Sequence, residues 1–318
     1  MSFVRTVLGD IDPSELGVTY AHEHLIIDGG RPVQMVPDFD LGDVDAMAVE
    51  VSAAVKLGLR SVVDAMPCDA GRSAEKLAEL ARRTGIHVIA PTGLHHDRYY
   101  GPTHWSARIT VDELAELFAL DVTDGIDAYD YAGPVVRRTP HRAGVIKVAG
   151  SENGPSDRDR RVFEAAAEAH RRTGVPILTH CEGGTGALEQ IRLLADHGVD
   201  LSHVVVSHVD KIVDRGYHRE ILATGALAEY DQGFRWGDLP NGTIRLLTWM
   251  AEDGLGGQIV LGMDAARRRY YLVFGGAPGL GWLLGGLIPM LATAGLDTGV
   301  RHALLVDNPA RAYAFARP

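Results

Sequence analysis

Short apolar segments alternate with amphipathic segments along most of the chain. Eight runs rich in β-branched or apolar residues have the length of buried strands: residues 16–27, 59–67, 86–95, 143–150, 175–182, 202–210, 225–231 and 257–264. Most are separated by segments with apolar residues at helical spacing, the clearest at 44–58, 73–85, 160–174 and 187–198, which end in a glycine suited to a helix C-cap. Strands that alternate with helices predict parallel pairing, and eight such units predict one (β/α)8 TIM barrel over residues 1–318.

Two segments depart from this alternation. Residues 97–142 form a longer insertion between the third and fourth predicted strands. Residues 270–296 carry no charge and are long enough to cross a bilayer. Their glycines, together with Pro278 and Pro289, would interrupt a membrane helix. The segment also has no basic flank on its C-terminal side, where a helix-like segment at 300–315 follows. We therefore expect a buried loop and helix or an oligomer surface here, and no membrane span.

Composition narrows the class of protein. A net charge of −11 argues against binding nucleic acid or an anionic membrane through a broad basic surface, and it fits an enzyme of small substrates. The first residues lack a charged start followed by an apolar run, so no signal peptide is expected. The cysteines, Cys68 and Cys181, lie in apolar segments, so a disulfide framework is not expected and a cytoplasmic location is the default. A homodimer is left open.

The first predicted strand carries two histidines with a glutamate between them. Successive side chains of a strand point to opposite faces, so His22 and His24 share one face and Glu23 looks the other way.

Polar side chains also mark the ends of other predicted strands. They are Lys147 in the fourth, His180 in the fifth, His208 in the sixth and Asp264 in the eighth. Because the C-terminal ends of barrel strands meet at the rim that carries the active site, four imidazoles, one carboxylate and one lysine are expected to converge there. A single histidine at a strand end is more often structural than a ligand. Independent structural roles do not explain the whole set. Other histidines lack this joint support and are interpreted as structural or substrate-facing, among them His95, His96, His104 and His203.

Lys147 lies in a run of valine and isoleucine, where an unpaired ammonium would be costly. Burial should lower its pKa and favour the neutral amine, which can react with carbon dioxide to give a carbamate. A carbamate is an anion with two oxygens, able to bridge two divalent cations in a site that has few carboxylates. The simpler alternative is that Lys147 pairs with Asp264 or another acid.

This ordered set resembles the phosphotriesterase family of the amidohydrolase superfamily, through "HEHL" at 22–25, the four later strand residues and "DNPAR" at 307–311. The resemblance covers the whole chain and implies a binuclear metal centre. His22, His24 and Asp264 would hold the more buried metal, His180 and His208 the more exposed one, and Lys147, as N6-carboxylysine, would bridge them. Imidazole and carboxylate ligands suit Zn²⁺, with Mn²⁺, Co²⁺ or Fe²⁺ as alternatives.

Such a centre implies hydrolysis of an ester-like bond by a metal-bridging hydroxide, with Asp264 as the proton carrier. The segment "MDAARRRYY" at 263–271 and Arg235 after the seventh strand place arginines near the same rim. An arginine fork suits carboxylate or phosphate, although these arginines could instead be solvated or paired with surface acids.

The arrangement looks like the branch of the family that hydrolyses phosphorylated sugar lactones, with Arg267 and Tyr270, and also Arg235, as substrate contacts. We therefore expect a lactonase for a small anionic lactone, with weak phosphotriesterase turnover as a side activity. The alternatives are an amidohydrolase that cleaves an N-acyl or carbamoyl bond, a phosphotriesterase, a neutral acyl-lactone hydrolase and, least favoured, a non-catalytic barrel.

Overall fold

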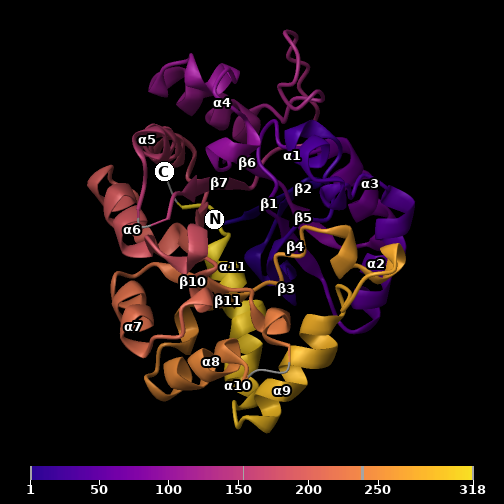
Figure 1. Ribbon diagram of the computed structural model, residues 1–318, viewed down its shortest axis with the longest axis vertical. Helices are drawn as coiled ribbons and strands as arrows, with labels where there is room; N and C mark the ends of the chain where they lie inside the picture. The colour runs from indigo at the N-terminus through magenta and orange to yellow at the C-terminus, as the bar shows by residue number, and fades with distance from the viewer. Residues whose placement is uncertain (1, 153, 238–239, 317–318) are drawn as a thin grey trace.

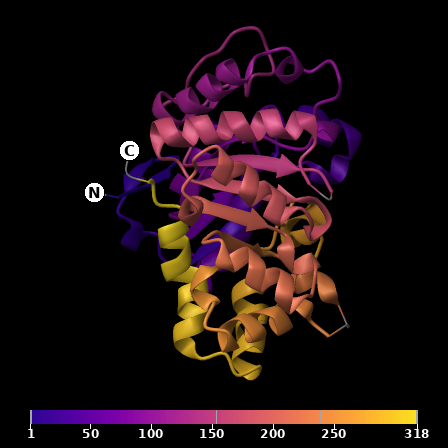
Figure 2. The same ribbon diagram turned by 90° about the vertical axis from the view of Figure 1, so that its left-hand side faces the viewer.

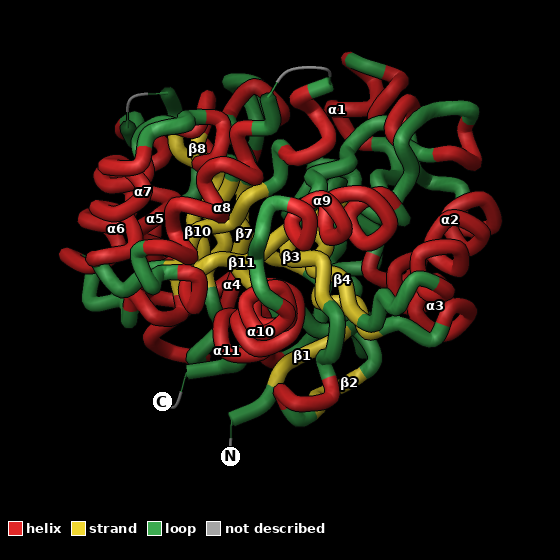
Figure 3. The backbone as a smooth tube through the Cα atoms, turned by 90° about the horizontal axis from the view of Figure 1, so that it is seen from below, coloured by secondary structure: helices red, strands yellow, loops and turns green. Residues whose placement is uncertain are grey.

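Parallel strands form a central barrel with helices around it in the computed structural model, which describes residues 2–152, 154–237 and 240–316 (Figures 1 and 3). The ends of the predicted domain, residues 1 and 317–318, lie outside the described residues. One sheet contains β3 (Thr19–Glu23), β4 (Ser61–Asp64) and β5 (His87–Ile89). The other contains, in chain order, β6 (Pro91–Leu94), β7 (Val145–Gly150), β8 (Ile177–Cys181), β9 (Val204–Ser207), β10 (Leu227–Tyr230) and β11 (Ile259–Leu261).

The two sheets meet at both edges. Ala90 alone separates β5 from β6, and beyond β11 the backbone N–H groups of Met263 and Asp264 donate to the carbonyl of His22 over 3.3 and 3.0 Å. This arrangement confirms the predicted TIM barrel. One predicted strand, residues 86–95, is divided into β5 and β6. The division falls at Ala90, directly before Pro91, which has no N–H to donate across a sheet.

The helices cover the outside of the barrel (Figure 1). Their bounds are α1 Gly30–Met35, α2 Val44–Lys56, α3 Ala74–Thr84, α4 Val111–Thr123, α5 Asp157–Thr173, α6 Ala187–Asp196, α7 Arg215–Ala223, α8 Gly242–Glu252, α9 Ile288–Thr293, α10 Thr298–His302 and α11 Asn308–Ala312. The predicted glycine caps of α3 and α5 are confirmed, because Gly85 and Gly174 adopt the left-handed conformation with φ of 75°.

The two irregular segments fold against the barrel. Within the insertion at 97–142, a 3-10 turn at Asp97–Tyr99 is followed by α4, which begins with a reciprocal cap between Thr110 and Glu113 that we did not predict. The apolar segment at 270–296 contains a short turn, the π-helical stretch Leu283–Leu287 and α9. Across the described ranges of the chain, no helix is long and apolar enough to span a membrane.

The barrel interior changes from apolar to polar along the strands. The layer nearer the N-terminal ends of the strands is a cluster of buried aliphatic side chains, which includes Val145, Leu178, Val205, Leu227 and Val260. This end is closed by the hairpin of β1 (Val4–Thr6) and β2 (Gly9–Ile11) and by the C-terminal segment. The first and last described segments of the chain meet there (Figure 2), with the Phe315 N–H donating to the Phe3 carbonyl over 2.9 Å.

Candidate metal centre

A polar layer lies directly above the aliphatic layer of the barrel. Because side chains two residues apart on a strand share a face, the positions two beyond Val145, Leu178, Val205 and Leu227 also point inward. Those positions are Lys147, His180, Ser207 and Glu229, and all four are buried. The C-terminal half of the barrel is therefore filled by groups that can ligate a metal or hydrogen-bond to a ligand.

A bulge in β3 brings His22 into this layer. Ala21 belongs to the aliphatic interior cluster, so regular alternation would turn His22 outward, but the pairing of β3 with β4 shifts register between Tyr20 and Glu23. His22 Nε2 lies 3.3 Å from Lys147 Nζ, and its Nδ1 lies 3.2 Å from both Ser207 Oγ and a carboxylate oxygen of Glu229.

His22 and His24 meet the same carboxylate. Their Nε2 atoms lie 3.7 and 3.3 Å from Oδ1 of Asp264. Glu23 points the other way, as predicted, and accepts the backbone N–H groups of Met263 and Ala265 over 2.7 and 3.2 Å. Asp264 has a φ of 47°, in the left-handed region that few non-glycine residues adopt. The buried Glu23 therefore holds the backbone on both sides of Asp264.

Lys147 is fully buried, and no carboxylate within the described parts of the chain lies at ion-pair distance from its ammonium nitrogen. The structure therefore does not contain the alternative arrangement, a direct ion pair between Lys147 and Asp264. Burial lowers the pKa of Lys147 to about 8, in the predicted direction, although the charges of Glu229 and Asp264 oppose the shift. At a given pH, a larger fraction of Lys147 is therefore in the neutral amine form than for a solvated lysine.

His180 and His208 approach each other from adjacent strands, with ring centroids 4.5 Å apart. His208 Nδ1 is hydrogen-bonded to the buried carboxylate of Asp231. His180 instead has its Nε2 atom 2.8 Å from a carboxylate oxygen of Glu182. Burial, followed by the contribution of His208, lowers the pKa of His180 to about 3, while the hydrogen bond to His180 holds the pKa of Glu182 far below its usual range despite partial burial.

A cavity of about 250 Å³ opens above these residues. Of the predicted site residues, it is lined by His22, His180, His208, Arg235, Asp264, Arg267 and Tyr270. It is also lined by Phe39, His95, Arg98, Tyr99, Glu182, Lys211 and Ala266. The sequence indicates a structural or substrate-facing role for His95 and does not single out the other six residues. Arg98 and Tyr99 lie in the turn Asp97–Tyr99 that comes shortly after β6, so their position after a barrel strand was the available signal.

The two arginines predicted to contact substrate differ in how strongly other residues of the protein bind them. Both terminal nitrogens of Arg235 donate to protein oxygens: the carbonyls of Asp231, Met263 and Asp264 at 2.8, 2.9 and 2.6 Å, and the Asp264 carboxylate at 3.2 Å. The guanidinium of Arg267 lies 4.3 Å above the Phe39 ring, with its nearest acid oxygen 3.9 Å away. Arg267 is the freer of the two arginines.

Charge around Asp264 favours its anion. Burial alone would raise the pKa of Asp264, but the hydrogen bond to His24 and the charge of Arg235 lower it well below the usual range. The carboxylate of Asp231 is likewise kept ionised by His208 against its burial, which lowers the pKa of Asp231. The sequence alone did not identify the acids that hold other site residues in place, which are Glu23, Glu229 and Asp231.

The donor set fits divalent cations. Burial lowers the pKa of His22 and His208 as well as that of His180, so these imidazoles are neutral near pH 7 and keep a lone pair for a metal. Nδ1 of His24 is buried and has no hydrogen-bond partner in the described part of the chain. Ligand atoms of His22, His24 and Asp264 lie within 4.8 Å of one another, as do those of His22, His208, Glu229 and Asp231.

Known proteins resemble this chain over nearly its full length. A family model described as "Phosphotriesterase family" matches residues 2–313. A phospho-furanose lactonase from Mycoplasmopsis synoviae (strain 53) is 34% identical, with 98% of this chain and 92% of that protein covered. Among solved structures, an amidohydrolase from Mycoplasma synoviae has a TM-score of 0.96 at 31% identity, covering 99% of this chain and 93% of that one. A lactonase from Listeria monocytogenes has a TM-score of 0.90 at 28% identity, covering 99% and 100%.

Proposed function

This chain belongs to the phosphotriesterase family, and from that premise we propose that it is a metal-dependent lactonase that opens a small phosphorylated sugar lactone. Weak hydrolysis of phosphotriesters is an expected side activity. The observation that carries this proposal is one cavity that combines the metal-competent cluster with a weakly engaged arginine, Arg267, and Tyr270. The name of the Mycoplasmopsis synoviae relative, phospho-furanose lactonase, supports the same class of substrate.

The phosphotriesterase family uses a binuclear metal centre, and the residues of this cluster fit one. We assign His22, His24 and Asp264 to the more buried cation, His180 and His208 to the more exposed one, and carboxylated Lys147 to both. Zn²⁺ suits this set of imidazole and carboxylate donors. Two bound divalent cations supply Lewis acidity and lower the pKa of water in the site.

Asp264 is the residue placed to move a proton. Its carboxylate is anionic, it lines the cavity, and Glu23 and Arg235 fix the backbone around it. It accepts the proton of the attacking water and passes it to the ring oxygen of the lactone as the acyl–oxygen bond breaks. The product is the ring-opened hydroxy acid.

Arg267 and Tyr270 lie on the segment after β11 and line the cavity. We assign them to the phosphate of the substrate, where a guanidinium gives charge-assisted hydrogen bonds. Arg235 lines the same cavity, and its bonds to Asp264 indicate a positioning role that is compatible with a further contact to substrate. A neutral triester would leave the charge of Arg267 without a partner.

A metal analysis followed by a substrate panel tests this proposal. We expect about two divalent cations per chain, as in other two-metal hydrolases. The panel compares phosphorylated sugar lactones with their unphosphorylated parents, a long-chain acyl lactone, a phosphotriester and an N-acyl amide. The phosphorylated lactones should have the highest kcat/KM. If the N-acyl amide were the best substrate, the amidohydrolase alternative would replace the proposal, because the metal ligands alone do not separate the two reactions.

A further inference from the structure

A carboxylate that the assigned ligand set does not use lies inside the metal cavity. Glu182 follows β8 directly and occupies the first position of the turn Glu182–Gly184, two residues after His180. Its side chain lines the cavity and has 28% of its area exposed. One of its oxygens, Oε2, lies 2.8 Å from Nε2 of His180.

The position of Glu182 differs from that of the acids beside the other histidines. Glu229 and Asp231 contact His22 and His208 at Nδ1, and neither acid lines the cavity. They are thus placed to orient the rings and to leave Nε2 free toward the centre of the barrel. Glu182 contacts His180 at Nε2 and is itself part of the cavity wall. It therefore stands on the side of the ring where a cation would be held.

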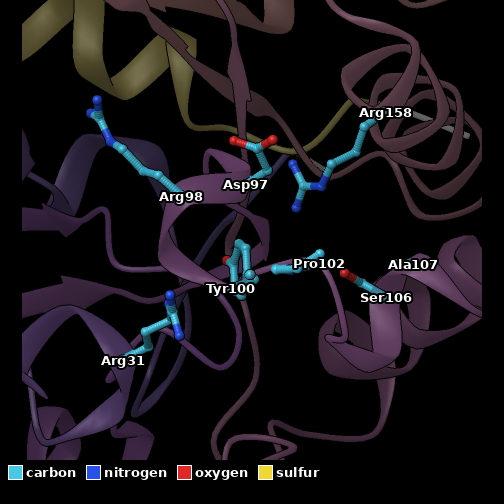
Figure 4. A pocket seen from close by; sticks show the side chains of 9 residues that line it. Arg31, Asp97, Arg98, Tyr100, Pro102, Ser106, Ala107 and Arg158 are labelled. Carbon is cyan, nitrogen blue, oxygen red and sulfur yellow. The ribbon is translucent and has the colours of Figure 1, made fainter. Parts of the chain in front are cut away.

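Arg98 is the counterion of Glu182 at the rim of the cavity. From the turn after β6, its two terminal nitrogens lie 3.3 and 3.2 Å from the two oxygens of Glu182. Figure 4 shows the neighbouring pocket of about 320 Å³, where the guanidinium of Arg98 points away from Asp97 and Arg158. Arg98 lines both that pocket and the metal cavity, and its ion pair with Glu182 balances one anionic group of the cavity wall with one cation.

We propose that Glu182 is a further metal ligand, which joins His180 and His208 at the more exposed cation site. The inference rests on the proposed function, because it takes a centre of two cations as given. His180 Nε2 lies within hydrogen-bond distance of the Glu182 oxygen. A divalent cation at this nitrogen would take the neutral imidazole in the tautomer that carries its proton on Nδ1, and the carboxylate of Glu182 would then neighbour the cation. Carboxylate oxygen is a good donor for Zn²⁺, Mn²⁺ and Co²⁺.

Two variants that break the same ion pair separate this role from a structural one. Glu182→Gln keeps an acceptor oxygen near His180 and removes the charge, whereas Arg98→Met removes the competing cation and leaves the carboxylate. Glu164→Gln, at an exposed position on α5, is the control for loss of one negative charge. Each metal-free protein is titrated with Zn²⁺ against a chromophoric chelator, which gives two stepwise dissociation constants. A parallel titration with Co²⁺ records the visible d–d absorption of each equivalent.

We expect Glu182→Gln to weaken the second Zn²⁺ by about 10- to 100-fold or more, since loss of a group that only orients a ligand already costs that much, and to leave the first unchanged. The Co²⁺ spectrum of the second equivalent should change in this variant alone. Arg98→Met should bind the second cation as tightly as the wild type or more tightly, because the carboxylate is no longer shared. Glu164→Gln should bind both cations as the wild type does.

Other results would overturn the inference. If Glu182→Gln binds both cations with wild-type affinity, or more tightly, Glu182 is not a ligand. If Glu182→Gln and Arg98→Met weaken the second cation equally, the ion pair only supports the loops after β6 and β8. A wild-type protein that binds fewer than two cations would instead contradict the proposed function, and the wild-type titration shows this before any variant is compared.

Discussion

Replacement of Arg267 tests the least constrained step of the proposed function, recognition of a phosphate. Arg267 lines the cavity, its side chain is 29% exposed, and its nearest acid oxygen, on Asp38, is 3.9 Å away. Its guanidinium lies 4.3 Å above the Phe39 ring. Arg267→Met removes the charge and keeps an apolar side chain on Phe39. Because exposed ion pairs contribute roughly 0–1 kcal/mol, the free energy of unfolding should change by no more than about 1 kcal/mol.

The expected effect on catalysis follows from the strength of one charge-assisted contact. A hydrogen bond to a charged group contributes roughly 1.5–3 kcal/mol, so its loss should reduce kcat/KM for a phosphorylated lactone by about one to two orders of magnitude. Hydrolysis of the unphosphorylated lactone should be nearly unchanged, since the cluster of metal-competent residues is untouched. The preference of the enzyme for the phosphorylated substrate should therefore largely disappear.

Arg269 provides the matched control in the same run of arginines. It does not line the cavity, its side chain is 60% exposed, and its Nε lies 3.2 Å from the same acid, Asp38. Arg269→Met should keep the preference. Both lactones are assayed at one fixed ionic strength, because salt screens exposed charges. If Arg267→Met slows both lactones equally, or if the wild type prefers long-chain neutral lactones, Arg267 does not bind phosphate and the apolar segment after Gly275 becomes the better candidate for the specificity pocket.

Three further variants test the metal centre and its support. Lys147→Ala should lose activity and at least one cation per chain, as measured by metal analysis. Bicarbonate should aid metal reconstitution of the wild type but not of this variant. Full metal occupancy in the variant would exclude a bridging carbamate. Asp264→Asn should lower kcat by far more than it raises KM, because the group acts mainly in the transition state, and near-normal turnover would require another proton carrier. Arg235→Met should lower the free energy of unfolding by about 3 kcal/mol, since three backbone carbonyls lose a charged donor; denaturant titration measures this, and an unchanged midpoint would mean that these bonds add nothing.

The barrel and its rim were predictable because their signals are local. Each strand is a short apolar run, and residues such as His180 and His208 occupy the strand ends in the linear sequence. The order of strands in a parallel barrel then places these ends on one rim without any knowledge of distant contacts. The division of the third strand before Pro91 also had a local cause, although it was not predicted.

The supporting carboxylates could not be found in the same way. Glu23 accepts backbone N–H groups of Met263 and Ala265, and no side-chain pattern in the sequence marks a backbone partner so far along the chain. In the sequence, Glu229 is only one polar residue within the predicted seventh strand. Its contact with His22 exists only once the barrel has formed. Glu182 lies only two residues after a predicted ligand, His180, but its direction toward the cavity depends on the turn after β8.

The conformation of Asp264 explains why two supporting side chains, Glu23 and Arg235, both bind the short backbone segment at 263–265. A non-glycine residue with a φ of 47° costs about 1–3 kcal/mol, and this conformation persists only where surrounding contacts impose it. Glu23 binds the N–H groups of the residues on either side of Asp264, and Arg235 binds the carbonyls of Met263 and of Asp264 itself. The two side chains come from β3 and from the turn after β10, the neighbours of β11 in the closed barrel. The position of the Asp264 carboxylate, the proposed proton carrier, therefore depends on closure of the barrel, and we expect Glu23 and Arg235 to affect kcat through it.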